Sequence, residues 1–162
     1  MKIRKPAFLI ALALCLVTAL FVPQAALTAE AASVVNISSA AGLAKALTDS
    51  KSAAYKLTAD ISGIKKEIRV TGGTKTLDLN GHSIKGSSTA SSLIFVRGGD
   101  LTIKSSASGG MIRNTNNQDA AGCGSGRLTL ESGTLQGLVY GIYQEGGTVN
   151  IKGGTVKGIE NA

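Results

Sequence analysis

The sequence predicts an all-β fold, a parallel β-helix in which short strands stack coil upon coil as a solenoid. Three observations favour it: a repeated phrase, glycine-rich corners between short strands, and the absence of proline after Pro23. The phrase sets an apolar, a polar and another apolar residue in a row. Its four statements begin at Leu77, Leu101, Leu128 and Val149, with spacings of 24, 27 and 21 residues. Proline would break a ladder of stacked strands, so its absence fits.

Residues 1–31 have the three-part pattern of a secretory signal peptide. A basic start is followed by a nearly unbroken apolar run at residues 8–22 and by small residues leading to a cleavage site after Ala31. The run is shorter than the roughly 20 residues of a membrane span. We therefore expect a secreted, extracellular or cell-surface protein without a stable membrane span after cleavage. An uncleaved anchor is the alternative.

The whole chain has a net charge of +7, and removal of residues 1–31 leaves +5. The remaining lysines and arginines are scattered along the chain and do not form a block interleaved with aromatic residues. Nucleic acid is therefore not predicted as a partner. A mild positive charge would suit the anionic polymers of a cell wall, although scattered charges on strands more often only face solvent.

Residues 32–62 are predicted to form an N-terminal cap of a strand, a short helix and a strand. A short strand is expected at Val34–Ile37. The helix is expected at residues 40–47, where the preceding serines suit an N-cap and two leucines lie four residues apart. Such a helix would cover the apolar end of the first coil. Residues 55–61 then alternate as a half-buried strand.

Residues 63–162 are predicted to form the coils, with corners marked by glycine and asparagine, which tolerate positive φ. The strands after residue 70 are expected at residues 76–79, 93–96, 101–103, 128–130, 137–143 and 148–151. An antiparallel sandwich or barrel would also use short strands, but it has no need to repeat one phrase in each turn. The sequence stops inside a coil, so we expect either a truncated C-terminus or end-to-end self-association of the last coil.

Alignment of the phrases predicts which side chains stack. The first inward ladder would consist of Leu77/Leu79, Leu101/Ile103, Leu128/Leu130 and Val149/Ile151. The outward columns beside it would be Asp78–Thr102–Thr129–Asn150 and Asn80–Lys104–Glu131–Lys152. A second inward ladder would join Ile84, Ile112, Leu135 and Val156, and a third would join Ile94/Val96, Val139 and Ile142.

These phrases resemble the right-handed parallel β-helix of the pectate lyase-like superfamily. The opening, with its short helix and the step Leu57-Thr-Ala-Asp-Ile61, is similar to the N-terminal region of large secreted or surface proteins of Gram-positive bacteria. The phrases in residues 75–86 and 147–156 carry the same resemblance, which covers residues 34–162. It implies the fold and export. It does not imply one activity, because the superfamily includes lyases, hydrolases, adhesins and stalks.

The sequence assigns no catalytic residue. A polysaccharide lyase needs a base and clustered carboxylates for Ca²⁺, yet Asp78 and Glu131 would lie two coils apart, roughly 10 Å. The motifs of polygalacturonase-like hydrolases, which use paired carboxylates, are missing. Residues 80–82, Asn-Gly-His, are predicted to form a turn rather than a catalytic site. Whether the protein is an enzyme stays open, and the sequence favours a non-catalytic role.

The candidate binding residues are two groups of side chains. Asn114, Asn116, Asn117 and Asp119 lie in the longest predicted insertion, residues 113–126, and such insertions often carry the binding face of a solenoid. Tyr140 and Tyr143 could stack on a sugar ring, with core or edge packing as the alternative. No cofactor and no metal site are predicted, since the single histidine and the lone mature cysteine, Cys123, make no zinc pattern.

The resulting hypothesis is a secreted or cell-surface β-helix scaffold that is non-catalytic and contacts cell-wall or extracellular polysaccharide. The alternative is the N-terminal part of a pectate lyase-like polysaccharide lyase or glycoside hydrolase whose catalytic coils lie outside this chain. Cys123 has no predicted role beyond a buried or idle thiol.

Overall fold

A computed structural model describes residues 33–159. Residues 1–32, which include the predicted signal peptide, and residues 160–162 lie outside the described part. One helix and thirteen strands follow one another in this part. They are β1 (Val34–Ile37), α1 (Ala40–Thr48), β2 (Ala53–Leu57), β3 (Ile61–Ile64), β4 (Ile68–Val70), β5 (Thr74–Asp78), β6 (Ser83–Gly86), β7 (Ser92–Lys104), β8 (Met111–Asn114), β9 (Asp119–Leu130), β10 (Thr134–Gly137), β11 (Ile142–Gln144), β12 (Thr148–Ile151) and β13 (Thr155–Gly158).

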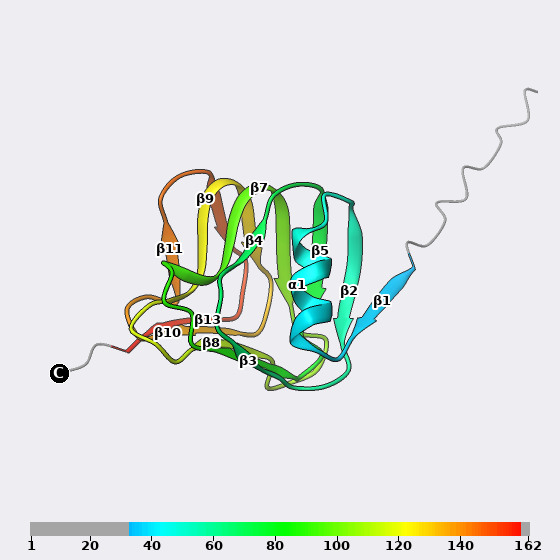
Figure 1. Cartoon of the computed structure of the whole chain (residues 1–162), viewed down its shortest axis with the longest axis horizontal. Helices are drawn as coiled ribbons and strands as arrows, with labels where there is room; N and C mark the ends of the chain where they lie inside the picture. The colour runs from blue at the N-terminus through cyan, green and yellow to red at the C-terminus, as the bar shows by residue number, and fades with distance from the viewer. Residues whose placement is uncertain (1–32, 160–162) are drawn as a thin grey trace, which may run out of the picture. The chain divides into compact units, whose positions relative to one another are not determined.

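The strands form a parallel β-solenoid of about five turns, which confirms the predicted fold class (Figure 1). The first face stacks β1, β2, β5, the end of β7, the end of β9 and β12. The second face stacks β3, β6, β8, β10 and β13. The third face stacks β4, the start of β7, the start of β9 and β11. The long strands β7 and β9 turn a corner and so belong to both the first and third faces.

Glycines form the corner between the third and first faces. Gly73, Gly99, Gly126 and Gly147 all have positive φ, between 62° and 79°. They stack closely: a Cβ on Gly126 would lie 2.1 Å from the carbonyl oxygen of Gly99. Any side chain here would therefore meet the backbone of the coil below, which explains why the sequence repeats glycine at this corner.

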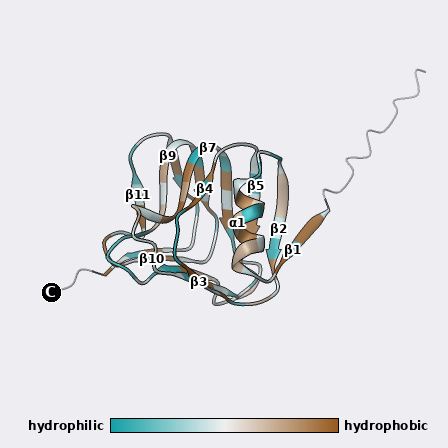
Figure 2. Ribbon diagram, viewed as in Figure 1, coloured by the Kyte–Doolittle hydropathy of each residue, from teal (hydrophilic) through white to brown (hydrophobic). Residues whose placement is uncertain are grey.

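The predicted capping helix is confirmed as α1. Ser39 is its N-cap, and its hydroxyl accepts a hydrogen bond of 3.1 Å from the Gly42 N–H. Leu43 and Leu47 are fully buried where α1 packs on β3 and β4. Beyond the helix, β1 exposes Val34 and Val35 and is the apolar outermost strand of the first face (Figure 2).

The predicted register of the first ladder is wrong in its earliest coil by two residues. Lys75, not Leu77, pairs with Leu101, and Leu77 pairs with Ile103. The repeat is therefore 26 residues between these coils, not 24. Leu79 follows β5 and is buried at the corner instead of in the strand. The later pairings, Leu101–Leu128–Val149 and Ile103–Leu130–Ile151, are as predicted.

The same shift corrects the outward columns. The column predicted to begin at Asp78 is Thr76–Thr102–Thr129–Asn150, and Asp78 pairs with Lys104. The register was mispredicted because Leu77-Asp-Leu79 has the same apolar–polar–apolar pattern as Leu101-Thr-Ile103. The residue that pairs with Leu101 is Lys75, two positions before Leu77. Because lysine is charged, the sequence does not indicate that this position is buried.

The second predicted ladder is confirmed, and Ile61 of β3 joins it beside Ile84. The third is correct in part: Ile94 and Ile142 align through Ala121, and Val96 aligns with Cys123. Val139 lies in the bend before β11, so its assignment to a ladder is wrong. The strand expected at residues 137–143 is also largely wrong. Gly137 is the last residue of β10, and the next strand, β11, begins only at Ile142.

Most of the predicted insertion at residues 113–126 is strand. Only residues 115–118 form a corner, and β9 begins at Asp119. Glycines 122 and 124 look like loop residues in the sequence. In the structure they lie under the ring of Phe95, which would be 2.7 Å from a Cβ at either position. These glycines are required by packing against an aromatic ring.

Candidate functional site

The corner between β8 and β9 holds the predicted asparagines. Asn114 is buried, and its side-chain nitrogen donates to the carbonyl oxygen of Asp119 at 3.0 Å. Its side-chain oxygen accepts from the Asn116 N–H at 3.2 Å. Asn116 donates to the Ser88 carbonyl at 3.4 Å, and Asn117 is exposed. The first two asparagines thus shape the corner, and Asn117 is the member of this group that faces solvent.

Asp119 connects this corner to the predicted tyrosines. Its carboxylate is buried and accepts a 2.9 Å hydrogen bond from the Tyr140 N–H. Burial raises the pKa of Asp119, and the hydrogen bond from Tyr140 opposes that rise. The structure therefore brings together two residues that are 21 positions apart in the sequence.

The two tyrosines are exposed rather than packed into the core, with 57% of Tyr140 and 38% of Tyr143 accessible. Tyr143 belongs to an outward column of the third face that also contains Arg69, Phe95 and Gly122. The guanidinium of Arg97 lies 4.5 Å from the centre of the Phe95 ring. This column therefore combines aromatic and cationic side chains on a parallel sheet.

A groove of about 430 Å³ adjoins the third face at the corner between β3 and β4. It shares Arg69 with that face and also contains Lys65, Lys66, Glu67 and Ser88. The carboxylate side chain of Glu67 is 4% exposed, and it accepts from Arg69 Nε at 2.8 Å and from Ser91 Oγ at 3.2 Å. Sequence reasoning missed this groove. The available signal was the charged Lys65-Lys-Glu67 one coil below the hydroxyl-rich Ser87-Ser-Thr89.

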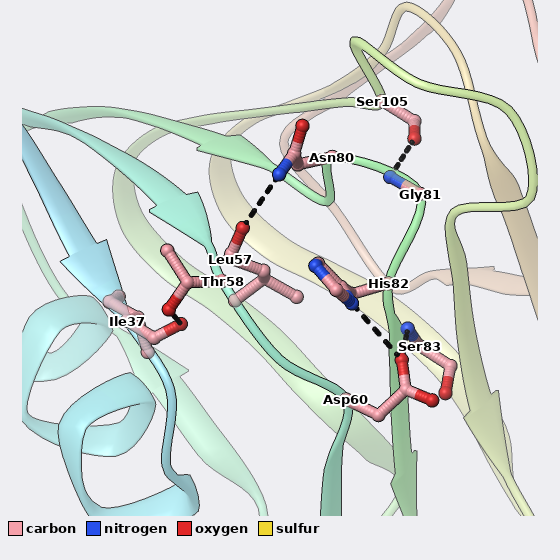
Figure 3. A network of polar contacts seen from close by, with 9 residues as sticks. All are labelled: Ile37, Leu57, Thr58, Asp60, Asn80, Gly81, His82, Ser83 and Ser105. Atoms are coloured by element: carbon pink, nitrogen blue, oxygen red, sulfur yellow. Dashed lines mark hydrogen bonds and ion pairs between the residues drawn. The ribbon is translucent and has the colours of Figure 1, made fainter.

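The predicted turn at residues 80–82 is confirmed. Asn80 and Gly81 have φ of 48° and 80°, and the His82 N–H donates to the Leu79 carbonyl at 2.8 Å. Asn80 also donates to the Leu57 carbonyl at 3.1 Å, and Ser105 Oγ accepts from the Gly81 N–H at 3.0 Å (Figure 3). The turn thus joins three successive coils.

His82 lies beside an exposed carboxylate at this corner. Its Nδ1 is 3.4 Å from Asp60 Oδ1, which also accepts from the Ser83 N–H at 2.8 Å (Figure 3). The hydrogen bond from Ser83 holds the pKa of Asp60 below its usual value. Asp60 therefore supports the next coil through a backbone hydrogen bond.

Three further carboxylates of the coils, those of Asp78, Asp100 and Glu131, also have partners. Asp78 is buried and accepts from the backbone N–H groups of Asn80 and Ser106, both at 2.8 Å. Asp100 pairs with Arg127 at 3.7 Å, and Glu131 pairs with Lys152 at 3.5 Å. Among residues 33–159, no three histidine, cysteine or acidic side chains gather as a metal site.

Cys123 is buried in the third inward ladder, where burial raises the pKa of its thiol. No helix in the described part of the chain is long and apolar enough to cross a membrane. No family model, curated protein or solved structure matches the chain.

Proposed function

We propose that this protein is a secreted or cell-surface β-solenoid scaffold that contacts polysaccharide without turning it over. The signal-peptide pattern of residues 1–31 supports export. The resemblance to the pectate lyase-like superfamily and to surface proteins of Gram-positive bacteria supports the class of scaffold. Fold alone does not identify a function, so the proposal depends on the surface of the third face.

The observation that carries the proposal is the exposed pair Tyr140 and Tyr143 beside a polar corner. An exposed tyrosine can stack its ring on the apolar face of a sugar while its hydroxyl bonds to the sugar's oxygens. The Asp119 carboxylate fixes the backbone at Tyr140, so this ring is presented from an ordered segment. Arg69 and Arg97 add donors on the same face.

Affinity electrophoresis in gels that contain soluble polysaccharides tests this function. We expect the Tyr140→Ala/Tyr143→Ala variant to bind about tenfold more weakly or worse, because two stacking contacts are lost. The matched Tyr140→Phe/Tyr143→Phe variant keeps both rings and should retain most of the affinity. Equal binding by the alanine and phenylalanine variants would contradict the proposed site.

Incubation of the same protein with polysaccharides tests the alternative, a polysaccharide lyase or glycoside hydrolase. Our proposal predicts no release of unsaturated or reducing sugars. Turnover that Asp78→Ala or His82→Ala abolishes would show that catalytic function resides in these coils, and the scaffold proposal would be wrong.

A second copy of the chain is a further proposed partner. Val35 and Ile151 are the first and last members of one inward column, and they are 47% and 58% exposed. A second copy that continues the parallel ladder would place these residues together. Sedimentation velocity should show concentration-dependent association that Ile151→Lys reduces. A strictly monomeric profile at high concentration would contradict end-to-end association.

A further inference from the structure

The second face carries a row of cationic side chains along the solenoid. Strand pairing aligns Lys85 of β6, Arg113 of β8, Gln136 of β10 and Lys157 of β13 in one column. They alternate with the buried ladder Ile84–Ile112–Leu135, so the column points outward. Adjacent strands lie about 4.8 Å apart, and the row therefore offers one polar side chain per coil at that interval.

A further cation flanks the start of this row. Lys65 and Lys85 line a small groove of about 160 Å³ together with Ser87 and Thr115. Lys65 Nζ donates to Ser87 Oγ at 3.0 Å, which directs its ammonium towards the β6 corner. The other outward column of the second face consists of Ser83, Met111, Thr134 and Thr155. Asp60, one coil before Ser83, accepts from the Ser83 N–H and pairs with His82.

The charge of this row is not balanced by neighbouring carboxylates. Within residues 33–159, the ion pairs join Arg69 to Glu67, His82 to Asp60, Arg127 to Asp100 and Lys152 to Glu131. None of them includes Lys65, Lys85, Arg113 or Lys157. Lys65, Lys85 and Lys157 are exposed, so their ammonium groups offer donors and positive charge that a ligand can reach.

We propose that this basic row, defined as Lys85, Arg113, Gln136 and Lys157 with Lys65 beside it, binds a linear acidic polysaccharide along the solenoid axis. One sugar unit of an extended chain advances by a length comparable to the strand spacing, so successive anionic groups can meet successive coils. Gln136 can bond to sugar hydroxyls between the cations. No aromatic side chain lies in either outward column of this face, whereas single-stranded nucleic acids bind by stacking on aromatic rings.

This inference rests on the proposed polysaccharide function and adds the charge class of the glycan and a second contact surface. The probes are alginate, whose sugar units carry carboxylates, inorganic polyphosphate as a phosphate-bearing polymer, neutral dextran, and single-stranded oligo(dT). We expect alginate to bind in preference to dextran, with an affinity that falls as salt rises. Polyphosphate bound more tightly than alginate would assign the row to phosphate groups and would overturn the choice of an acidic polysaccharide.

The variant Lys85→Gln/Lys157→Gln removes two exposed charges from the row and should weaken alginate binding at least about tenfold, with a smaller salt dependence. Arg113→Gln should add to the loss, and thermal melting establishes whether that variant remains folded. The matched control is Lys51→Gln/Lys152→Gln, which removes two exposed lysines outside the row and should bind as the wild type does. An equal loss in the control would mean attraction to net charge alone and would overturn the assignment.

Three further outcomes distinguish a failure of this inference from a failure of the proposed function. If the row variants bind alginate normally while Tyr140→Ala/Tyr143→Ala does not, the basic row is wrong and the polysaccharide function stands. If no polysaccharide binds at all, both are wrong. Oligo(dT) bound as tightly as alginate, with the same loss in the row variants, would assign the row to nucleic acid and overturn our inference.

Discussion

The ring of Phe95 occupies the space above Gly122 that a side chain would need. A Cβ at position 122 would lie 2.7 Å from that ring, and one at Gly124 would also lie 2.7 Å from it. Phe95 is fully buried, although it belongs to an outward column of the third face. The ring therefore covers two glycines of the next coil from outside, and the Arg97 guanidinium lies over it.

Gly122→Ala should destabilise the fold, because the added Cβ would lie 2.7 Å from this ring and 2.6 Å from Ser92 Oγ. Overpacking of this kind costs about 1–3 kcal/mol in the free energy of unfolding. Gly72→Ala is the matched control, because a Cβ there makes only ordinary contacts, the nearest at 3.6 Å. Urea unfolding of both variants measures the difference. Equal stability of the two would show that the Phe95 ring does not occupy this position.

Lys75 should make stability rise with pH. Burial lowers the pKa of its ammonium, and the charge of Asp49 opposes this only in part. In the unfolded chain the pKa of Lys75 is about 10.4, so between the folded and unfolded pKa values the unfolded state holds more protons. Stability must then increase as the pH rises through that window.

The variant Lys75→Met tests this dependence. It removes the titrating group while keeping an unbranched side chain at an interior position beside Leu101. Wild-type melting temperature should rise from pH 7 towards pH 10 relative to the variant, and the variant should be at least as stable at pH 7. Parallel pH profiles for the two proteins would contradict the buried position of Lys75.

We predict that Asp119 supports Tyr140 as a hydrogen-bond acceptor and that its negative charge is not required. Asp119→Asn keeps an oxygen for the Tyr140 N–H and should match the wild type near neutral pH. Asp119→Ala leaves that donor without its partner and should cost about 1 kcal/mol. Burial raises the pKa of the Asp119 carboxyl. As the pH rises from the unfolded-state pKa to the folded-state pKa of this group, the wild type should therefore lose stability relative to the Asp119→Asn variant.

Chemical denaturation at several pH values separates these cases. A large loss in Asp119→Asn at pH 7, equal to that of the alanine variant, would show that the negative charge itself is needed. A wild type that gains stability over the asparagine variant across that pH range would contradict the raised pKa.

The capping helix should depend on Ser39. Its hydroxyl accepts from the Gly42 N–H, and Ser39→Ala should cost about 1 kcal/mol of stability. Ser38→Ala is the adjacent control, since Ser38 is exposed and precedes the cap. Thermal melting compares the two, and an equal effect would contradict the N-cap assignment.

The sequence was sufficient for the solenoid, the capping helix and the second ladder, because Ile84, Ile112 and Leu135 repeat without an interrupting charge. It was insufficient where tertiary contacts allow or require a residue type that is unusual for its position. Lys75 takes an apolar position, and its side chain bonds to the Gly72 carbonyl inside the coil. Likewise, Gly122 resembles a loop residue until the Phe95 ring above it is known.

The candidate surfaces show the same limit. Asn114 and Asp119 belong to a polar sequence that suggests a loop open to ligands, yet both side chains are buried and hold the corner. The basic row could not be recognised from scattered lysines, because Lys85, Arg113 and Lys157 become neighbours only through the pairing of β6, β8, β10 and β13.

The most direct test of polysaccharide contact is a map of the backbone amide resonances that move when an acidic oligosaccharide, an alginate fragment, is added to the labelled protein. We predict saturable shifts at residues 140–143 on the third face and at Lys85 and Arg113 on the second, with none at β1, the outermost strand of the first face. Saturation at α1 or β1 alone, or no saturable shift at millimolar oligosaccharide, would contradict the account.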